Sequence, residues 1–225
     1  LLVSAKNTIL ITAVGTLLNM VMTVLAAYPL SKKRLMGRSG LLLFITFTML
    51  FVSGMIPNFI LIKTLGLMNS YWSLWLPALI STYNLFVMKT YFEGLPEEIE
   101  ESASIDGAND LTILLKIALP LSKPILAALS LFYAVGWWNS YFQVLLYITR
   151  STKQTLMVKL YQMINQVDAS LLNGAGGSEG ASQVLLTPEA VKAAAIVLSV
   201  TPILCVYPFL QRHFVKGVLI GSVKG

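Results

Sequence analysis

The side chains that could perform acid–base or nucleophilic chemistry are few and unevenly placed. Seven of the ten Asp and Glu residues lie between Glu93 and Asp110, while the single histidine is His213 and the single cysteine is Cys205. Hydrolysis would need a nucleophile with a base, or a pair of carboxylates in one site. Because Cys205 lies in an apolar run, we interpret it as a small packing residue. The pattern predicts no catalytic or metal site and directs attention to the acidic stretch.

The composition predicts that the rest of the chain lies in a bilayer. Of 225 residues 56% are hydrophobic and 12% charged, with a mean hydropathy of +0.75. A spanning helix needs about 20 mostly apolar residues. Five windows qualify, at roughly 8–30, 41–62, 71–92, 125–148 and 190–210. We therefore expect an all-α, polytopic membrane protein that forms one transmembrane domain over residues 1–225.

The basic residues predict the orientation. The first loop carries Lys32, Lys33, Arg34 and Arg38 with no acid, and short loops rich in Lys and Arg stay in the cytoplasm. Alternation then places residues 93–124 in the cytoplasm and residues 63–70 and 149–189 outside. The net charge of +6 is explained by this orientation signal, so we expect membrane lipid and no nucleic acid as a partner.

The predicted spans lack the groups that would drive transport by themselves. Glu189, at the edge of the last window, is the only acid within them. Without a visible proton relay, energy for uphill movement is expected to enter from outside this chain. Sodium coupling through backbone carbonyls remains an open alternative.

The acidic stretch predicts a helix–turn–helix elbow at the cytoplasmic surface. Pro96 and the acids after it suit a first helical turn, so a short helix is expected from about Pro96 to Ser104. Gly107 can adopt the left-handed conformation that ends a helix. Asn109 or Asp110 could cap a second helix through Leu119, before Pro120 and Pro124 turn the chain. The alternative is a solvated acidic loop without a partner.

The spacing in this elbow resembles a known motif. Glu101-Ser102-Ala103, Gly107, Ile117 and Leu119-Pro120 stand at the intervals of the EAA loop of permease subunits in bacterial binding-protein-dependent ABC importers. Ser102 replaces the usual first Ala of that motif. Trp138-Asn139 and the tail YPFLQRHFVKGVLIGSVKG are similar to the maltose-type carbohydrate permeases, with the oligosaccharide and polysaccharide branch most alike. Such subunits usually have six spans, which implies a further span before Leu1.

The resemblance implies a type I ABC importer permease in the bacterial cell membrane. Residues 93–124 would then couple to a cytosolic ATP-binding subunit, which binds ATP and Mg and hydrolyses ATP, so this chain itself is expected to need no cofactor and to be no enzyme. A second homologous permease subunit and an extracellular solute-binding protein would complete the assembly. The residues implied in coupling are Glu101, Ser102, Ala103, Asp106, Gly107, Ala108, Ile117, Leu119 and Pro120.

Polar and aromatic residues at membrane depth are candidates for the substrate path. Amides can bind sugar hydroxyls, and aromatic rings can face the flat CH surfaces of a carbohydrate. The alternative for each is an interfacial anchor or a bridge between helices. The candidates are Asn19, Asn58, Tyr83, Asn84, Trp137, Trp138, Asn139, Tyr141, Gln143 and Tyr147.

The outer segment 149–189 divides into two parts. Leu156, Leu160, Met163 and Val167 recur at helical spacing, which predicts an amphipathic helix on the membrane surface. A Gly- and Ser-rich stretch, 173–182, follows it. By the resemblance this outer loop reaches toward the solute-binding protein, and a simple linker is the alternative.

Three other functions remain to be weighed against a carbohydrate importer. The same machinery could carry another solute. A self-sufficient channel or sodium-coupled carrier would transport without an ATP-binding subunit. An intramembrane enzyme would need a nucleophile and base that the sequence does not place together.

Overall fold

In the computed structural model, the residues described are 1–51, 53–173 and eight isolated positions between 190 and 204. All regular elements among them are helical. The predicted window 190–210, the Gly- and Ser-rich stretch 174–182 and the tail lie largely or wholly outside the described residues.

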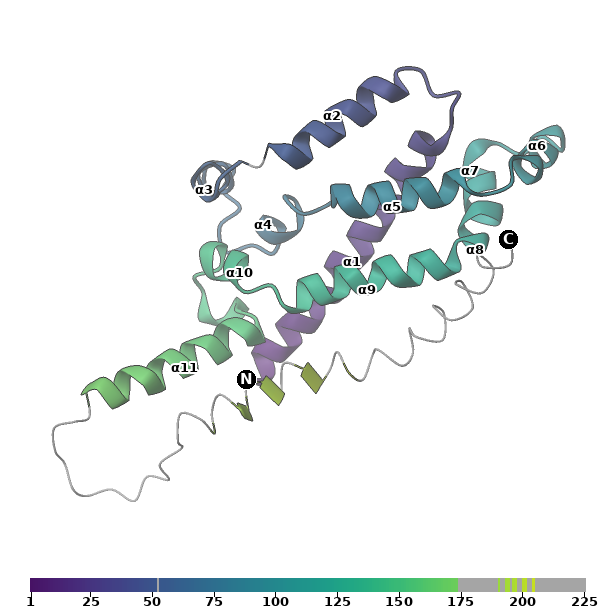
Figure 1. Ribbon diagram of the computed structural model, residues 1–225. Helices are drawn as coiled ribbons and strands as arrows, with labels where there is room; N and C mark the ends of the chain where they lie inside the picture. Colours follow the sequence, from purple (N-terminus) through teal and green to yellow (C-terminus); the bar gives the residue numbers. More distant parts are fainter. Residues whose placement is uncertain are drawn as a thin grey trace.

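The central element is α1, Leu2–Ser31, which crosses behind α5, Thr82–Glu93, and α9, Lys123–Trp138 (Figure 1). Its most extensive packing is against these two helices. One core cluster, which includes Ala27 and Met88, lies toward the C-terminal end of α1. A second, which includes Ile11 and Trp137, lies toward its N-terminal half.

The expected spans 41–62, 71–92 and 125–148 are not single helices. The first is divided into α2, Arg38–Leu50, and α3, Met55–Thr64, and the next into α4, Trp72–Trp75, and α5. The third ends with α9 at Trp138 and resumes as α10, Phe142–Tyr147. Gly54 precedes α3, and its lack of a side chain favours an interruption. Pro77 lies between α4 and α5, and its lack of a backbone N–H does the same.

Length and composition therefore support fewer unbroken spans than the sequence suggested. Among the described residues, α1 alone is long and apolar enough to cross a bilayer as one straight helix. Counting each bent pair of helices as one span raises the number to three at most. The windows 41–62, 71–92 and 125–148 are thus interrupted in the described structure, because hydropathy does not register breaks within an apolar run, while the window 190–210 lies largely outside the described residues.

The predicted elbow is confirmed in its local structure. Helix α6, Glu97–Ile105, is followed by α7, Asp110–Ile113, a π-helical turn Leu114–Ala118, and α8, Leu119–Leu121. The side chain of Asn109 caps α7 by accepting the N–H of Thr112 at 2.8 Å. An 83° bend then separates the Asp110–Leu121 segment from α9.

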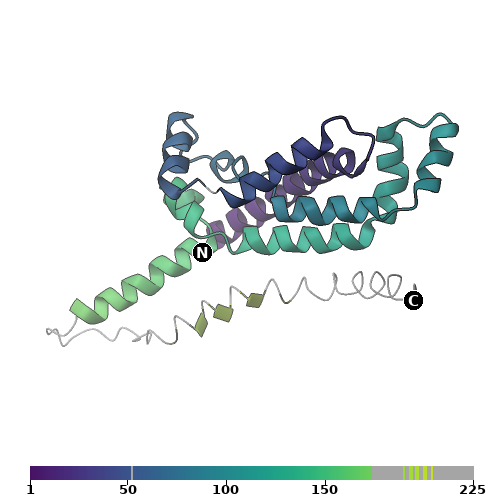
Figure 2. The same ribbon diagram turned by 45° about the horizontal axis from the view of Figure 1, so that its top comes forward.

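Segments predicted to share a membrane face do lie together. The first loop lies against the elbow at one end of the bundle, while the turn near Asn69 contacts the start of the outer segment at the other. The expected amphipathic helix is α11, Leu156–Asn173, which extends away from the body at the end opposite to α6 (Figure 2). Its first turns are anchored, because Leu156 and Leu160 are buried beside Trp138. Whether α11 lies on a membrane stays a prediction.

Candidate functional site

The elbow is organised by a tight helix ending at Gly107. The N–H of Ala108 donates to the carbonyl of Ala103 at 3.0 Å, and the N–H of Gly107 donates to the carbonyl of Ser104 at 3.0 Å. Gly107 has a φ of +82°, which completes a Schellman ending. The four-residue interval from Ala103 to Gly107 thus has a physical reason. In this helix ending, the left-handed residue stands four positions after the residue whose carbonyl accepts the closing hydrogen bond.

The residues expected in coupling fall into two groups. The apolar ones are half-buried against the core cluster near the end of α1; these are Ala103, Ala108, Ile117 and Leu119. The others are exposed, namely Glu101, Ser102, Asp106, Gly107 and Pro120. One group can therefore hold the elbow to the membrane body, while the other remains accessible.

Two features of the elbow were missed by sequence reasoning. Ile105 is 86% exposed beside the turn, so a large apolar side chain stands among the exposed acids of the elbow. A π-helical turn holds Ile117, and such turns often occur at functional positions. No sequence pattern used above indicates either feature, although the run of apolar residues around Ile117 was visible.

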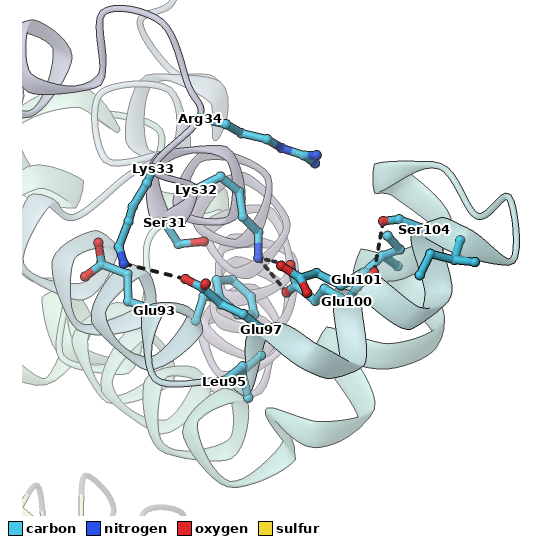
Figure 3. A pocket seen from close by; sticks show the side chains of 13 residues that line it. Ser31, Lys32, Lys33, Arg34, Glu93, Leu95, Glu97, Glu100, Glu101 and Ser104 are labelled. Atoms are coloured by element: carbon cyan, nitrogen blue, oxygen red, sulfur yellow. Dashed lines mark hydrogen bonds and ion pairs between the residues drawn. The ribbon is translucent and has the colours of Figure 1, made fainter.

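The elbow and the first loop enclose a pocket of about 640 Å³ (Figure 3). Its walls carry charges of both signs. Lys32 pairs with Glu100, and Lys33 lies 3.6 Å from Glu97. Arg34 on the same loop pairs with Asp110. Basic residues that the sequence explained through orientation alone therefore also hold the acidic stretch.

A second cavity, of about 490 Å³, lies between α1, α5 and α9. Five of the substrate-path candidates line it: Asn19, Asn84, Trp137, Asn139 and Gln143. Asn19 is 1% exposed, and the hydroxyl-bearing residues Ser81, Tyr133 and Ser140 also line the cavity. No Lys, Arg, Asp or Glu is among the lining residues in the described part of the chain. Amide, hydroxyl and aromatic groups are thus brought together without charge.

Hydrogen bonds hold the wall of this cavity in place. The amide of Asn19 donates to the carbonyl of Leu79 at 2.8 Å and to that of Ala78, and its Oδ1 accepts the indole N–H of Trp137 at 2.6 Å. The hydroxyls of Thr23 and Tyr133 are 2.7 Å apart. Trp137 and Asn19 therefore bridge helices, whatever they do toward a substrate.

The remaining substrate-path candidates lie elsewhere. Asn58 bonds with Ser53, with its Oδ1 accepting at 3.0 Å, and Tyr83 is 59% exposed. Trp138 packs toward α11. The rings of Tyr141 and Tyr161 are 4.6 Å apart, and Tyr147 is buried beside Phe59. The structure does not gather all candidates at one place, because residues adjacent in sequence on α9 and α10 face different directions.

Helices α1 and α9 approach closely at Gly15. A Cβ built on Gly15 would lie 2.6 Å from the indole of Trp137. Glycine here lets α1 and α9 come together with the tryptophan ring between them.

These features define a class of protein: an all-helical membrane subunit with a polar internal cavity and an accessible helical elbow at one end. The family model described as "Binding-protein-dependent transport system inner membrane component" matches residues 9–220. The chain belongs to this family. It is therefore an inner-membrane component of a transport system that works with a binding protein.

Individual relatives agree with this assignment. The chain is 48% identical to Protein LplC of Bacillus subtilis over 218 residues, covering 96% of this chain and 72% of that protein. It is 46% identical to the polygalacturonan/rhamnogalacturonan transport system permease protein YtcP of the same organism, covering 96% and 75%.

A solved structure is also similar. It is the crystal structure of a bacterial ABC transporter involved in the import of the acidic polysaccharide alginate, and one of its chains matches with a TM-score of 0.81 and 35% identity. The match covers 94% of this chain and 74% of that one. The expected type I ABC importer permease fold is thereby confirmed.

Proposed function

We propose that this chain is the permease subunit of an ATP-driven oligosaccharide importer, and that the elbow couples it to a separate ATP-binding subunit. The observation that carries this proposal is the division of the elbow residues into a half-buried anchoring group and an exposed group around Gly107. A rigid, solvent-facing helix ending is suited to seat in a cleft of another protein. ATP and Mg would be bound by that partner.

The contact surface proposed for the ATP-binding subunit includes Glu101, Ser102, Asp106 and Ile105. Ile105 supplies an apolar group that a cleft can bury, and the acids around it supply charge for orientation. Ala103, Ala108, Ile117 and Leu119 are proposed to transmit force, because they pack against the core cluster of the membrane body.

The substrate class is proposed from the relatives and from the cavity. One relative is a permease protein of a polygalacturonan/rhamnogalacturonan transport system, and the similar crystal structure is that of an ABC transporter involved in the import of alginate. The cavity offers amides from Asn84, Asn139 and Gln143 beside an indole, which suits the hydroxyls and CH faces of a sugar. We propose Asn139 and Gln143 as contacts of the translocated chain. A second permease subunit and a solute-binding protein would complete the importer.

The test is co-purification from native membranes in mild detergent, followed by reconstitution. We expect an ATP-binding protein and a second permease to remain with the chain, and to be lost when Ile105 is changed to Glu. Uptake would then be measured with labelled oligogalacturonides and, in parallel, neutral maltooligosaccharides. ATP-dependent uptake of either sugar class supports the proposal.

Two results would contradict it. Transport by this polypeptide alone, without an ATP-binding subunit, would favour a channel or a sodium-coupled carrier. ATP-dependent uptake of amino acids or phosphate but of neither sugar would retain the importer and overturn the substrate class. Asn139→Ala should reduce uptake while the complex still assembles, and Asn58→Ala is its matched control, since Asn58 lies outside the cavity.

A further inference from the structure

Helix α6 is held to the protein in an unusual way. It forms the tip of the elbow (Figure 1), and none of its residues is buried. Among its residues, Ala103 alone packs, half-buried, against the core cluster. Since apolar burial is the main source of helix docking, a helix with so little of it needs another attachment to stay in one position.

The attachment is supplied by three consecutive basic residues at the end of α1. Lys32 pairs with Glu100 in the middle of α6, and Lys33 lies 3.6 Å from Glu97 at its start. Arg34 pairs with Asp110 at the start of α7. One short segment therefore forms ion pairs with both helices of the elbow, on either side of Gly107.

The pair Lys32–Glu100 differs from its two neighbours in burial. Both of its side chains are only 18% exposed, whereas those of Lys33 and Glu97 are 85% and 75% exposed. The ammonium of Lys32 also lies 4.5 Å from the centroid of the Tyr28 ring. Partial burial reduces screening by water and salt, so this pair contributes more than an exposed one. Figure 3 shows both carboxylate oxygens of Glu100 directed at Lys32.

We propose that the basic segment of Lys32, Lys33 and Arg34 is an electrostatic latch that makes α6 move together with α1. Its main contact is the ion pair between Lys32 and Glu100. Lys32 and Glu100 are positioning residues in this assignment. The inference rests on the proposed coupling role of the elbow, and it adds the element inside this chain that receives the movement.

The position of α1 gives the latch a consequence. The same helix carries Asn19, which lines the cavity and is bonded to Trp137 on α9. Displacement of the elbow would therefore reach the cavity wall through one continuous helix, without passing through a flexible connection. If the latch is broken, the elbow can follow the ATP-binding subunit while α1 stays in place.

The test uses the complete complex and charge reversal. Glu100→Lys places two like charges together and adds a positive charge to the predicted cytoplasmic side, so it does not oppose the orientation signal. The double variant Glu100→Lys with Lys32→Glu restores an opposite pair. Glu98→Lys is the matched control: it makes the same charge change on the same helix, and no ion pair of Glu98 occurs in the described structure.

Two readouts separate the latch from a general loss of structure. In Glu100→Lys, amide hydrogen exchange of residues 97–106 should become about threefold to tenfold faster, since α6 is the weakly packed element. ATP hydrolysis should persist while uptake falls at least about tenfold. The reversed pair should recover most of the uptake and most of the wild-type protection of α6 against exchange. Glu98→Lys should resemble the wild type.

The outcomes are distinguishable from failure of the proposed function. If the purified wild-type complex contains no ATP-binding subunit, the coupling role of the elbow itself is overturned. An assembled, active wild type together with normal exchange and uptake in Glu100→Lys would overturn the latch alone. Loss in Glu100→Lys that the reversed pair does not repair would also overturn it, as would equal loss in Glu98→Lys.

Discussion

The indole nitrogen of Trp137 donates a 2.6 Å hydrogen bond to the Oδ1 of Asn19, and both side chains are buried. This bond joins α9 to α1 at the wall of the amide-lined cavity. The amide of Asn19 in turn holds the carbonyls of Ala78 and Leu79, where the chain lacks helical hydrogen bonding near Pro77. One asparagine thus connects three segments that are distant in sequence.

Removal of this bond should destabilise the helix packing. Trp137→Phe keeps an aromatic ring but leaves the buried Oδ1 of Asn19 without its donor, at a cost of about 1–3 kcal/mol. A lower melting temperature of the detergent-purified protein would show this. Trp72→Phe is the control, because Trp72 is 48% exposed. Equal melting temperatures for both variants would contradict a structural role of the bond.

Close approach of α1 and α9 should make Gly15 intolerant of even a methyl group. Its Cβ would lie 2.6 Å from the ring of Trp137, so Gly15→Ala must displace the ring or the helix, for about 1–3 kcal/mol. Thermal unfolding in detergent measures the effect. Gly136→Ala is the paired control, since a Cβ there meets no atom within 4 Å beyond its own helix backbone and chain neighbours, and stability should be unchanged or slightly higher because Ala favours a helix interior. Similar stability of the two variants would show that the packing adjusts without cost.

The turn of the elbow should depend on backbone conformation at Gly107. Since no atom lies within 4 Å of a Cβ built there, the cost of substitution comes from the left-handed φ of +82°, about 1–2 kcal/mol. Gly107→Val should therefore weaken retention of the ATP-binding subunit and reduce uptake, while membrane insertion stays normal. Gly107→Asn should preserve much of both, because asparagine tolerates this conformation. Full uptake with Val, or equal loss with Asn, would contradict the conformational explanation.

The outer end of the bundle should depend on Asn69. Its φ is +60°, and its Oδ1 accepts the N–H groups of Thr149 and Arg150 at 2.8 and 2.9 Å and the hydroxyl of Thr149 at 2.9 Å. Asn69→Ala should speed amide exchange over residues 149–153. Asn69→Asp keeps acceptor oxygens and tolerates the backbone, so its exchange should stay near the wild-type rate. If both variants exchange alike, the side chain does not organise this segment.

Local patterns were sufficient to predict the elbow. The residues Pro96, Gly107 and Asn109 each have a conformational preference that acts within a few positions, and all three occur where that preference predicts. The amphipathic helix beginning at Leu156 was predictable for the same reason. The motif spacing likewise indicated the permease family, because the helix ending imposes that spacing locally.

Relations across the chain required the tertiary structure. Hydropathy could not reveal that helices end at Leu50, Trp75 and Trp138, because apolar residues continue on both sides of each interruption. Nor could it select the five cavity residues from the longer list of polar and aromatic candidates, since this depends on which way each helix faces.

The sequence by itself determined a helical membrane protein, its family and its elbow, because composition and short-range backbone preferences decide these. Only the tertiary structure decided that Lys32 meets Glu100 and that Asn19 meets Trp137, across 68 and 118 positions of chain. Such contacts depend on the packing of α1 against distant helices, and packing is the sum of many weak interactions that no local pattern contains.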